Sequence, residues 1–100
     1  MKNETYLIQF EWDEEKNKKN ILKHGIDFRT ATLVFNDAGY IDIYDDKHSS
    51  MDEERHIIIG LIKDVVVVVC ILYDEITRII SARTATRAEE ELYYEREIQY

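Results

Sequence analysis

The sequence is poor in residues that interrupt or cross-link a chain, with no proline, three glycines and one cysteine among 100 residues. A single cysteine excludes a disulfide within the chain. No linker, repeat or low-complexity tract is present, so the length predicts one domain over residues 1–100. The longest apolar run, Val65–Leu72, has eight residues, whereas a bilayer-spanning helix needs about 20. The first residues lack the hydrophobic stretch of a signal peptide. We therefore expect a soluble, cytoplasmic protein without membrane association.

Basic residues are also scarce, with 13 Lys and Arg against 21 Asp and Glu and a net charge of −8. Such a surface as a whole repels phosphate backbones and argues against general nucleic-acid binding. The charge is nevertheless uneven, because residues 26–75 hold eleven of the acids and only four of the bases. The remaining half of the chain is nearly balanced, so a local basic site remains compatible with the composition.

Helix and strand signals follow one another without gaps. Asp13 is a typical N-cap and Gly25 a typical C-terminal stop, which predicts a helix over residues 14–24. This helix has little apolar content and should lie at the surface. Thr86 and Glu89 have the spacing of a capping box that opens a helix over 87–98. The other expected elements are strands at 6–12, 40–44, 55–62, 65–73 and 76–83, and a short helix at 28–35 capped by Asp27.

The order of these elements predicts an α+β domain with a mostly antiparallel sheet of four to five strands. Two helices would lie in the N-terminal part of the chain and one at the C-terminal end. The strand at 65–73 is apolar at every position, which is typical of a central strand covered on both faces. The strand before it is joined to it by Lys63-Asp64, a hairpin connection.

Metal and nucleotide signatures are missing. The candidate soft ligands His24, His48, His56 and Cys70 do not fall at a metal-ligand spacing. Cys70 lies inside the valine-rich strand and is expected to be a buried, inert thiol. There is no glycine-rich phosphate loop and no Gly-x-Ser-x-Gly turn. We expect no metal and no cofactor.

Several cations occupy positions that a solvated surface does not require. Lys16, Asn20 and Lys23 share one face of the helix at 14–24, which fits either a solvated face or a binding site. Arg78 and Arg83 differ in parity along their strand, so only a bulge, or departure of the chain from the sheet at Arg83, would bring them together. Arg87 opens the last helix, where a cation opposes the helix dipole unless an anion compensates.

Three blocks of residues resemble the BrnT family, the toxins of type II toxin–antitoxin systems. The first is Phe10-Glu11-Trp12-Asp13-x-x-Lys16-x-x-x-Asn20-x-x-Lys23-His24-Gly25-Ile26-x-Phe28-x-x-Ala31. The second is Glu54-Arg55 with Ile59-Gly60, and the third is Arg78-Ile79-Ile80-Ser81-Ala82-Arg83-x-Ala85-Thr86-Arg87-x-Glu89, with Tyr93 beyond. Together they cover about residues 10–95.

The resemblance implies a RelE-like fold and a metal-independent ribonuclease that cuts mRNA and arrests growth. It also implies a BrnA-like antitoxin, a ribbon-helix-helix DNA-binding protein, and a toxin–antitoxin complex that represses its own operon. The residues carried over as catalytic are His24, Glu54, Arg55, Arg78 and Arg83. Those carried over as RNA-binding are Lys16, Lys23 and Arg87.

Ribonuclease chemistry assigns roles to these residue types. RNA supplies its own nucleophile, the 2′-OH, so the protein must align it, move protons and stabilise the pentavalent phosphate. We expect the three arginines of the catalytic set to hold the phosphate. The base would be His24 or Glu54, and the acid the other of these two or Lys23. His56 follows Arg55 directly and should face the other way, in a structural role.

The acidic composition keeps a second function class open. A catalytically degenerate protein could pair with an antitoxin and act only in transcriptional regulation, because excess negative charge weakens long-range attraction to RNA. A third possibility, a housekeeping domain, would require that no small antitoxin gene lie beside this one. An acidic body also suits a basic antitoxin, whose association it would accelerate.

Overall fold

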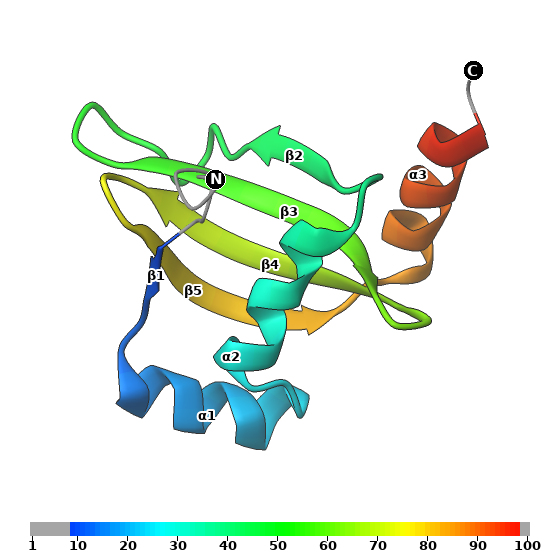
Figure 1. The fold of residues 1–100 in the computed structure, drawn as a ribbon. Coiled ribbons are helices and arrows are strands. Elements are labelled where there is room, and N and C mark those ends of the chain that lie inside the picture. The colour runs from blue at the N-terminus through cyan, green and yellow to red at the C-terminus, as the bar shows by residue number, and fades with distance from the viewer. Residues whose placement is uncertain (1–8, 99–100) are drawn as a thin grey trace, which may run out of the picture.

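A five-stranded sheet organises the chain in the computed structural model, which describes residues 9–98 and the side chains of residues 9–95 (Figure 1). The elements are β1 (Phe10–Glu11), α1 (Glu14–His24), α2 (Phe28–Ala31), the 3₁₀-helix η2 (Thr32–Asn36), β2 (Ile41–Tyr44), β3 (Glu54–Ile62), β4 (Val65–Tyr73), β5 (Thr77–Thr84) and α3 (Arg87–Ile98). The strand order is β1-β5-β4-β3-β2, with β1 parallel to β5 and the other pairs antiparallel. The predicted α+β class is confirmed.

The sequence signals for helix ends are confirmed by their hydrogen bonds. The carboxylate of Asp13 accepts from the backbone N–H groups of Glu15 and Lys16, and these bonds lower its pKa. Gly25 adopts φ 75° and its N–H donates to the carbonyl of Ile21. A left-handed residue at this position ends α1 with little strain only if it is glycine.

Five expected elements have different boundaries in the structure. The strand expected at 6–12 forms over Phe10–Glu11 among the described residues, and residues 6–8 lie outside them. The helix expected at 28–35 changes after Ala31 from α-helix to a 3₁₀-helix. The hydroxyl of Thr32 donates to the carbonyl of Arg29, a local bond that competes with regular helix geometry. β2 begins one residue later than expected and β3 one residue earlier, whereas β5 is shifted by one residue toward the C-terminus at both ends.

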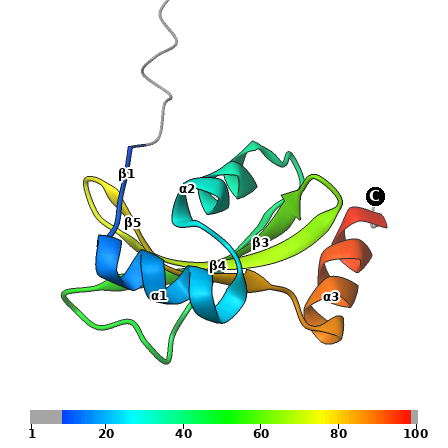
Figure 2. The same cartoon turned by 90° about the horizontal axis from the view of Figure 1, so that it is seen from below.

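The thin apolar content of α1 predicts a surface helix, but two of its polar side chains are buried. Asn17 and Asn20 are only 3 % and 8 % exposed. Asn17 accepts from the N–H of Phe28 at the start of α2. Asn20 bonds to both the N–H and the carbonyl of Ala82 on β5. Hydrogen bonds in place of apolar packing therefore hold α1 along the edge of β5 (Figure 2).

The two faces of the sheet are covered differently. α2 and η2 lie on one face, where Phe28, Ala31 and Val34 pack against the centre of the sheet. On the other face, α3 places Tyr93 over a second apolar cluster at one end of the sheet. The loop between β2 and β3 borders that face at its other end, on the side away from α2 (Figure 2). Among the described residues, no helix covers the part between α3 and this loop.

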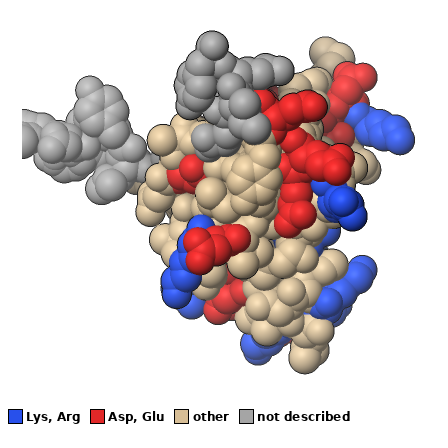
Figure 3. Space-filling model, turned by 90° about the vertical axis from the view of Figure 1, so that its right-hand side faces the viewer, with Lys and Arg blue, Asp and Glu red and all other residues tan. Residues whose placement is uncertain are grey.

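α3 is fixed to the sheet at two points. The hydroxyl of Tyr93 donates to Asp37 at 2.6 Å, and the backbone N–H of Leu61 donates to the same carboxylate oxygen at 2.9 Å. Burial would raise the pKa of Asp37, but these bonds and one from the N–H of Gly39 lower it. The second point is Glu89, which forms the predicted capping box with Thr86 and also binds Arg83 of β5. Acidic side chains gather on the side of the molecule that carries α3 (Figure 3).

The prediction for the central strand is confirmed in its main feature. Val66–Val69 and Ile71 on β4 are buried, with neighbours on both faces. Cys70 was expected to be buried but is only half-buried, because its side of the sheet lies under neither α2 nor α3. Within the described part of the chain, no helix has the length and hydrophobicity required to cross a bilayer.

Candidate active site

A bulge in β5 aligns the arginines whose parity the sequence left unresolved. Ser81 pairs with Cys70, but Ile79 pairs with the next residue of β4, so Ile80 is an extra residue in β5. The bulge reverses the alternation of side chains. As a result Arg78, opposite Leu72, and Arg83, opposite Val68, share one face of the sheet. For the two arginines to share a face, the sequence required a bulge, or departure of the chain from the sheet at Arg83, and the bulge is present.

Arg55 and Arg78 form a row across this face. Both pair with Leu72, Arg55 from β3 and Arg78 from β5. Two strand spacings separate their backbones by about 10 Å, so two extended guanidinium groups can meet over Leu72. Along β3, Arg55 shares its face with Ile57, which belongs to the cluster under α3. The row thus lies on the face that α2 leaves open.

A basic hollow lies between α1 and β5. It has a volume of about 230 Å³ and is bounded by α1 and the bulge of β5. The residues that line it are Lys16, Lys19, Asn20, Lys23, His24, Ile80 and Ser81. We call it the helix hollow. The shared face of Lys16, Asn20 and Lys23 is therefore neither wholly solvated nor wholly a binding surface, because Asn20 anchors the helix and the lysines flank it.

A second hollow, of about 190 Å³, lies on the other side of the same bulge. We call it the loop hollow, because residues of the β2–β3 loop form one wall. It shares Ile80 and Ser81 with the helix hollow, and Arg55 and Cys70 contribute from β3 and β4. The two hollows make one concave surface that runs from α1 across β5 to the loop.

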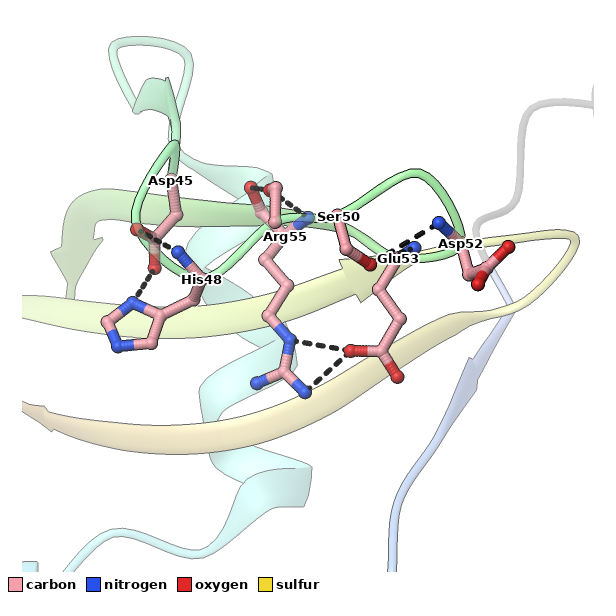
Figure 4. A network of polar contacts seen from close by, with 7 residues as sticks. Asp45, His48, Ser50, Asp52, Glu53 and Arg55 are labelled. Carbon is pink, nitrogen blue, oxygen red and sulfur yellow. Dashed lines mark hydrogen bonds and ion pairs between the residues drawn. The ribbon is translucent and has the colours of Figure 1, made fainter.

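The loop is tied to Arg55 by its backbone. The N–H of Asp45 donates to the carbonyl of Arg55 at 2.8 Å, and the N–H of Arg55 donates to the hydroxyl of Ser49 at 2.9 Å. The Arg55 guanidinium in turn donates from Nε and Nη2 to one oxygen of Glu53, at 3.1 and 2.9 Å (Figure 4). Arg55, one of the two residues of the row, thus also anchors the loop.

The carboxylates beside Arg55 and Arg78 balance their charge without enclosing them. Arg55 is 32 % exposed and pairs with Glu53, which is 45 % exposed. Arg78 pairs with Glu11 of β1 at 3.3 Å, with both side chains partly exposed. Exposed pairs of this kind contribute about 0–1 kcal/mol. A phosphate that bridges the two guanidinium groups can therefore displace these partners at little cost.

Arg83 has a different environment from the row. Its two terminal nitrogens donate to the two oxygens of Glu89 at 2.7 and 2.9 Å. The bidentate bond from Arg83 lowers the pKa of Glu89 to about 2 and raises that of Arg83. Four residues along β4 separate the partners of Arg78 and Arg83, a distance of about 13 Å. In this structure, Arg83 connects the sheet to the first turn of α3.

Glu54 and Arg87 lie away from the concave surface. Strand alternation turns Glu54 to the α2 face, where its carboxylate contacts Nε2 of His56 at 2.8 Å. Nδ1 of the same ring contacts Asp42. Burial would lower the pKa of His56, but the two carboxylates raise it, in keeping with the structural role expected. Arg87 is 91 % exposed on α3 and pairs with Glu91.

The concave surface thus holds four of the eight site residues expected from sequence, Lys16, Lys23, His24 and Arg55. A fifth, Arg78, shares the sheet face of Arg55 by its register but lines neither hollow. The structure adds His48 to the concave surface. The Asp45-x-x-His48 spacing was the only sequence signal for this residue. Among the described residues, no three His, Cys, Asp or Glu side chains converge in an arrangement that could hold a metal ion.

The concave surface lies within a segment that matches a known family. The sequence profile of the ribonuclease toxin BrnT, of type II toxin–antitoxin systems, matches residues 12–89. The chain belongs to the BrnT family. The matched segment begins just before α1 and ends in the first turn of α3, so it includes both hollows and Arg83. No curated protein sequence matches the chain.

Family membership confirms the resemblance seen in the three sequence blocks and supplies a coarse function. BrnT proteins are ribonuclease toxins, and a type II system pairs its toxin with a protein antitoxin. The chain is therefore a toxin-family protein for which an antitoxin partner is implied.

Proposed function

We propose that the chain is an endoribonuclease that cleaves mRNA through attack of the 2′-OH on the adjacent phosphate, without a metal ion. Cleavage in the cytoplasm would inhibit translation and growth. The observation that carries this proposal is the Arg55–Arg78 row, which places two arginines on the same open sheet face, with Arg55 lining the loop hollow. Arginine side chains bind phosphate bidentately, and they act best where charge develops in the transition state.

The helix hollow suits the RNA backbone beside the scissile phosphate. Lys16, Lys19 and Lys23 line it, and each lysine that contacts a phosphate adds affinity that falls with salt concentration. The negative charge of the chain does not oppose this contact, because residues 26–75 carry most of it and α3 carries exposed acids on its own side (Figure 3).

Proton transfer to the leaving group is assigned to His24. It ends α1 and lines the helix hollow, so the imidazolium can protonate the 5′ oxygen as the bond to phosphorus breaks. Glu54 is not proposed as the base, because its side chain lies on the α2 face beside His56. Arg83 is proposed to fix α3 beside the site. It would affect cleavage only through this positioning, without contacting the RNA.

The partner is proposed to be a BrnA-like ribbon-helix-helix antitoxin that neutralises the toxin and binds operator DNA in the complex. The exposed acidic side chains of α3, Glu90, Glu91 and Glu95, would attract a basic segment of such a protein. The toxin would contact DNA only through this complex.

Cleavage of a defined RNA by the purified protein in EDTA tests the activity. Arg55→Ala should lower the rate about 10²- to 10³-fold, the usual effect of removing one donor to the transition-state charge. Arg29→Ala is the matched control: it also removes one positive charge, but Arg29 lies over the ring of Trp12 and beside Asp27, outside both hollows. A 2′-deoxy substitution at the scissile position should abolish cleavage. Loss of activity in EDTA, or equal rates for the two variants, would contradict the proposal.

Expression in a bacterial host tests the role as a toxin. Growth arrest that a neighbouring small ribbon-helix-helix protein relieves supports it. Harmless expression, with no cleavage by the purified protein but tight binding of that neighbour, would instead identify the degenerate regulatory module. One observation favours this regulatory function: in the free chain, carboxylates already pair with Arg55, Arg78 and Arg83.

A further inference from the structure

A histidine–carboxylate pair borders the loop hollow. Nδ1 of His48 lies 2.8 Å from Oδ2 of Asp45, and the other oxygen of Asp45 accepts from the backbone N–H of His48 at 3.3 Å. The carboxylate is shielded, with 16 % of the Asp45 side chain exposed, whereas the imidazole is 65 % exposed. Asp45 is thus the shielded member of the pair, and His48 is the member that is accessible to a substrate.

The fold holds this pair beside Arg55. The N–H of Asp45 and the hydroxyl of Ser49 bond to the backbone of Arg55 on the two sides of the pair. The imidazole of His48 and the guanidinium of Arg55 project from the loop and from β3 to the same side of the sheet (Figure 4). Both line the loop hollow together with Ser81.

The pairing determines which nitrogen of His48 carries a proton. A carboxylate only accepts hydrogen bonds, so Nδ1 is the protonated nitrogen of the neutral ring and Nε2 keeps its lone pair. A carboxylate in this position also stabilises the imidazolium that forms when Nε2 takes up a proton. The geometry is that of an oriented general base, within a hollow that also holds a phosphate-binding side chain.

We propose that His48, oriented by Asp45, is the general base of the ribonuclease reaction, an inference that rests on the function proposed above. Nε2 of His48 takes the proton of the 2′-OH while the 2′ oxygen forms a bond to phosphorus. The bond from phosphorus to the 5′ oxygen breaks, and that oxygen takes a proton from the His24 imidazolium. The products are a 2′,3′-cyclic phosphate end and a 5′-hydroxyl end. Water then carries the proton from His48 back to His24.

The arrangement of the two hollows fits this division of roles. An in-line displacement needs its base and acid on opposite sides of the phosphate. His48 lines the loop hollow and His24 the helix hollow, with Ile80 and Ser81 between them. His56, the remaining histidine, also borders the loop hollow, but both of its ring nitrogens contact carboxylates, those of Asp42 and Glu54. Neither nitrogen is therefore free to accept the proton of the 2′-OH.

His48→Gln and Asp45→Asn test the assignment, with Asp46→Asn as the matched control that makes the same charge change one residue away. His48→Gln should lower kcat about 10²- to 10⁴-fold and remove the limb of the pH–rate profile that reports a base. Asp45→Asn should lower kcat less and leave KM close to that of the wild type. Asp46→Asn should retain the wild-type rate and profile. Equal melting temperatures show that the loop variants are folded.

A substrate with a bridging 5′-sulfur separates the base from the acid, because a thiolate leaves without protonation. It should restore the rate of His24→Ala but not that of His48→Gln. Added imidazole should partly restore His48→Ala. If His48→Gln keeps the wild-type rate and pH profile while Arg55→Ala lowers the rate as expected, the assignment is wrong and the proposed function stands. If the wild-type protein cleaves no RNA, both are wrong.

Discussion

The buried amide of Asn20 links the fold to the site, and its removal is the most informative stability experiment. Its Nδ2 donates to the carbonyls of Ile26 and Ala82 at 2.9 and 2.8 Å, and its Oδ1 accepts from the N–H of Ala82 at 3.2 Å. Among residues 9–98, β5 pairs with β1 only at Thr77 and Arg78, so at Ala82 the amide takes the place of a neighbouring strand.

The expected cost of Asn20→Ala follows from the groups it would leave unpaired. Each buried backbone group without a partner costs about 1–3 kcal/mol, and Ala82 is fully buried. About 1.5 kcal/mol for each of the two buried groups at Ala82 and about 0.5 kcal/mol for the partly buried carbonyl of Ile26 give about 3.5 kcal/mol. The better helix propensity of alanine subtracts about 0.5 kcal/mol. A net loss of about 3 kcal/mol is a large share of the 5–15 kcal/mol typical of a domain.

Urea or thermal unfolding measures this loss. For a chain of this length, about 3 kcal/mol corresponds to a fall in Tm on the order of 15 °C. Leu22→Ala on the same helix is the control, because Leu22 is 88 % exposed and should change the free energy of unfolding by less than about 0.5 kcal/mol. If Asn20→Ala differs from this control by less than about 1 kcal/mol, hydrogen bonding to β5 does not hold α1 in place.

Two further substitutions test the packing around the site. Glu89→Gln should cost about 1–2 kcal/mol at neutral pH, while Glu90→Gln on the exposed side of α3 should cost nothing measurable. Because the folded-state pKa of Glu89 is about 2 against 4.5 unperturbed, the difference from wild type should be complete above about pH 5 and vanish toward pH 2; a pH-independent difference would contradict the ion pair. Gly60→Ala should lower the unfolding free energy by about 1–3 kcal/mol, since a Cβ there would lie 2.9 Å from Val34 and 3.1 Å from Asp37. An unchanged Tm would show that η2 can move away from β3.

The expected site residues differ in how well sequence could place them. Lys16, Lys23 and His24 belong to one helix with clear ends, so their common face follows from the helical period alone. Glu54 and Arg55 are adjacent in a strand, and alternation alone could have placed them on opposite faces. The family motif pairs them as neighbours in sequence, which says nothing about the side of the sheet that each one faces.

From the sequence, His48 was considered only as a metal ligand. Its proposed role as the general base depends on contacts between segments that are not adjacent in sequence. A lone histidine in a polar loop is unremarkable until the loop is seen bonded to the backbone of Arg55. Asn20 illustrates the same limit. Its position on α1 is predictable, but its burial depends on Ala82, 62 residues further along the chain.

The sequence by itself determined the helix ends, the β3–β4 hairpin, the α+β class and the family, because caps, turns and hydrophobic patterns act over a few residues. Only the tertiary structure decided which charged groups share a surface. The bulge at Ile80 arises from the pairing of β5 with β4, and it places Arg78 in one row with Arg55 and on the same face as Arg83. Strand pairing is a contact between distant segments, and no local pattern encodes the one-residue shift that sets the face of each side chain.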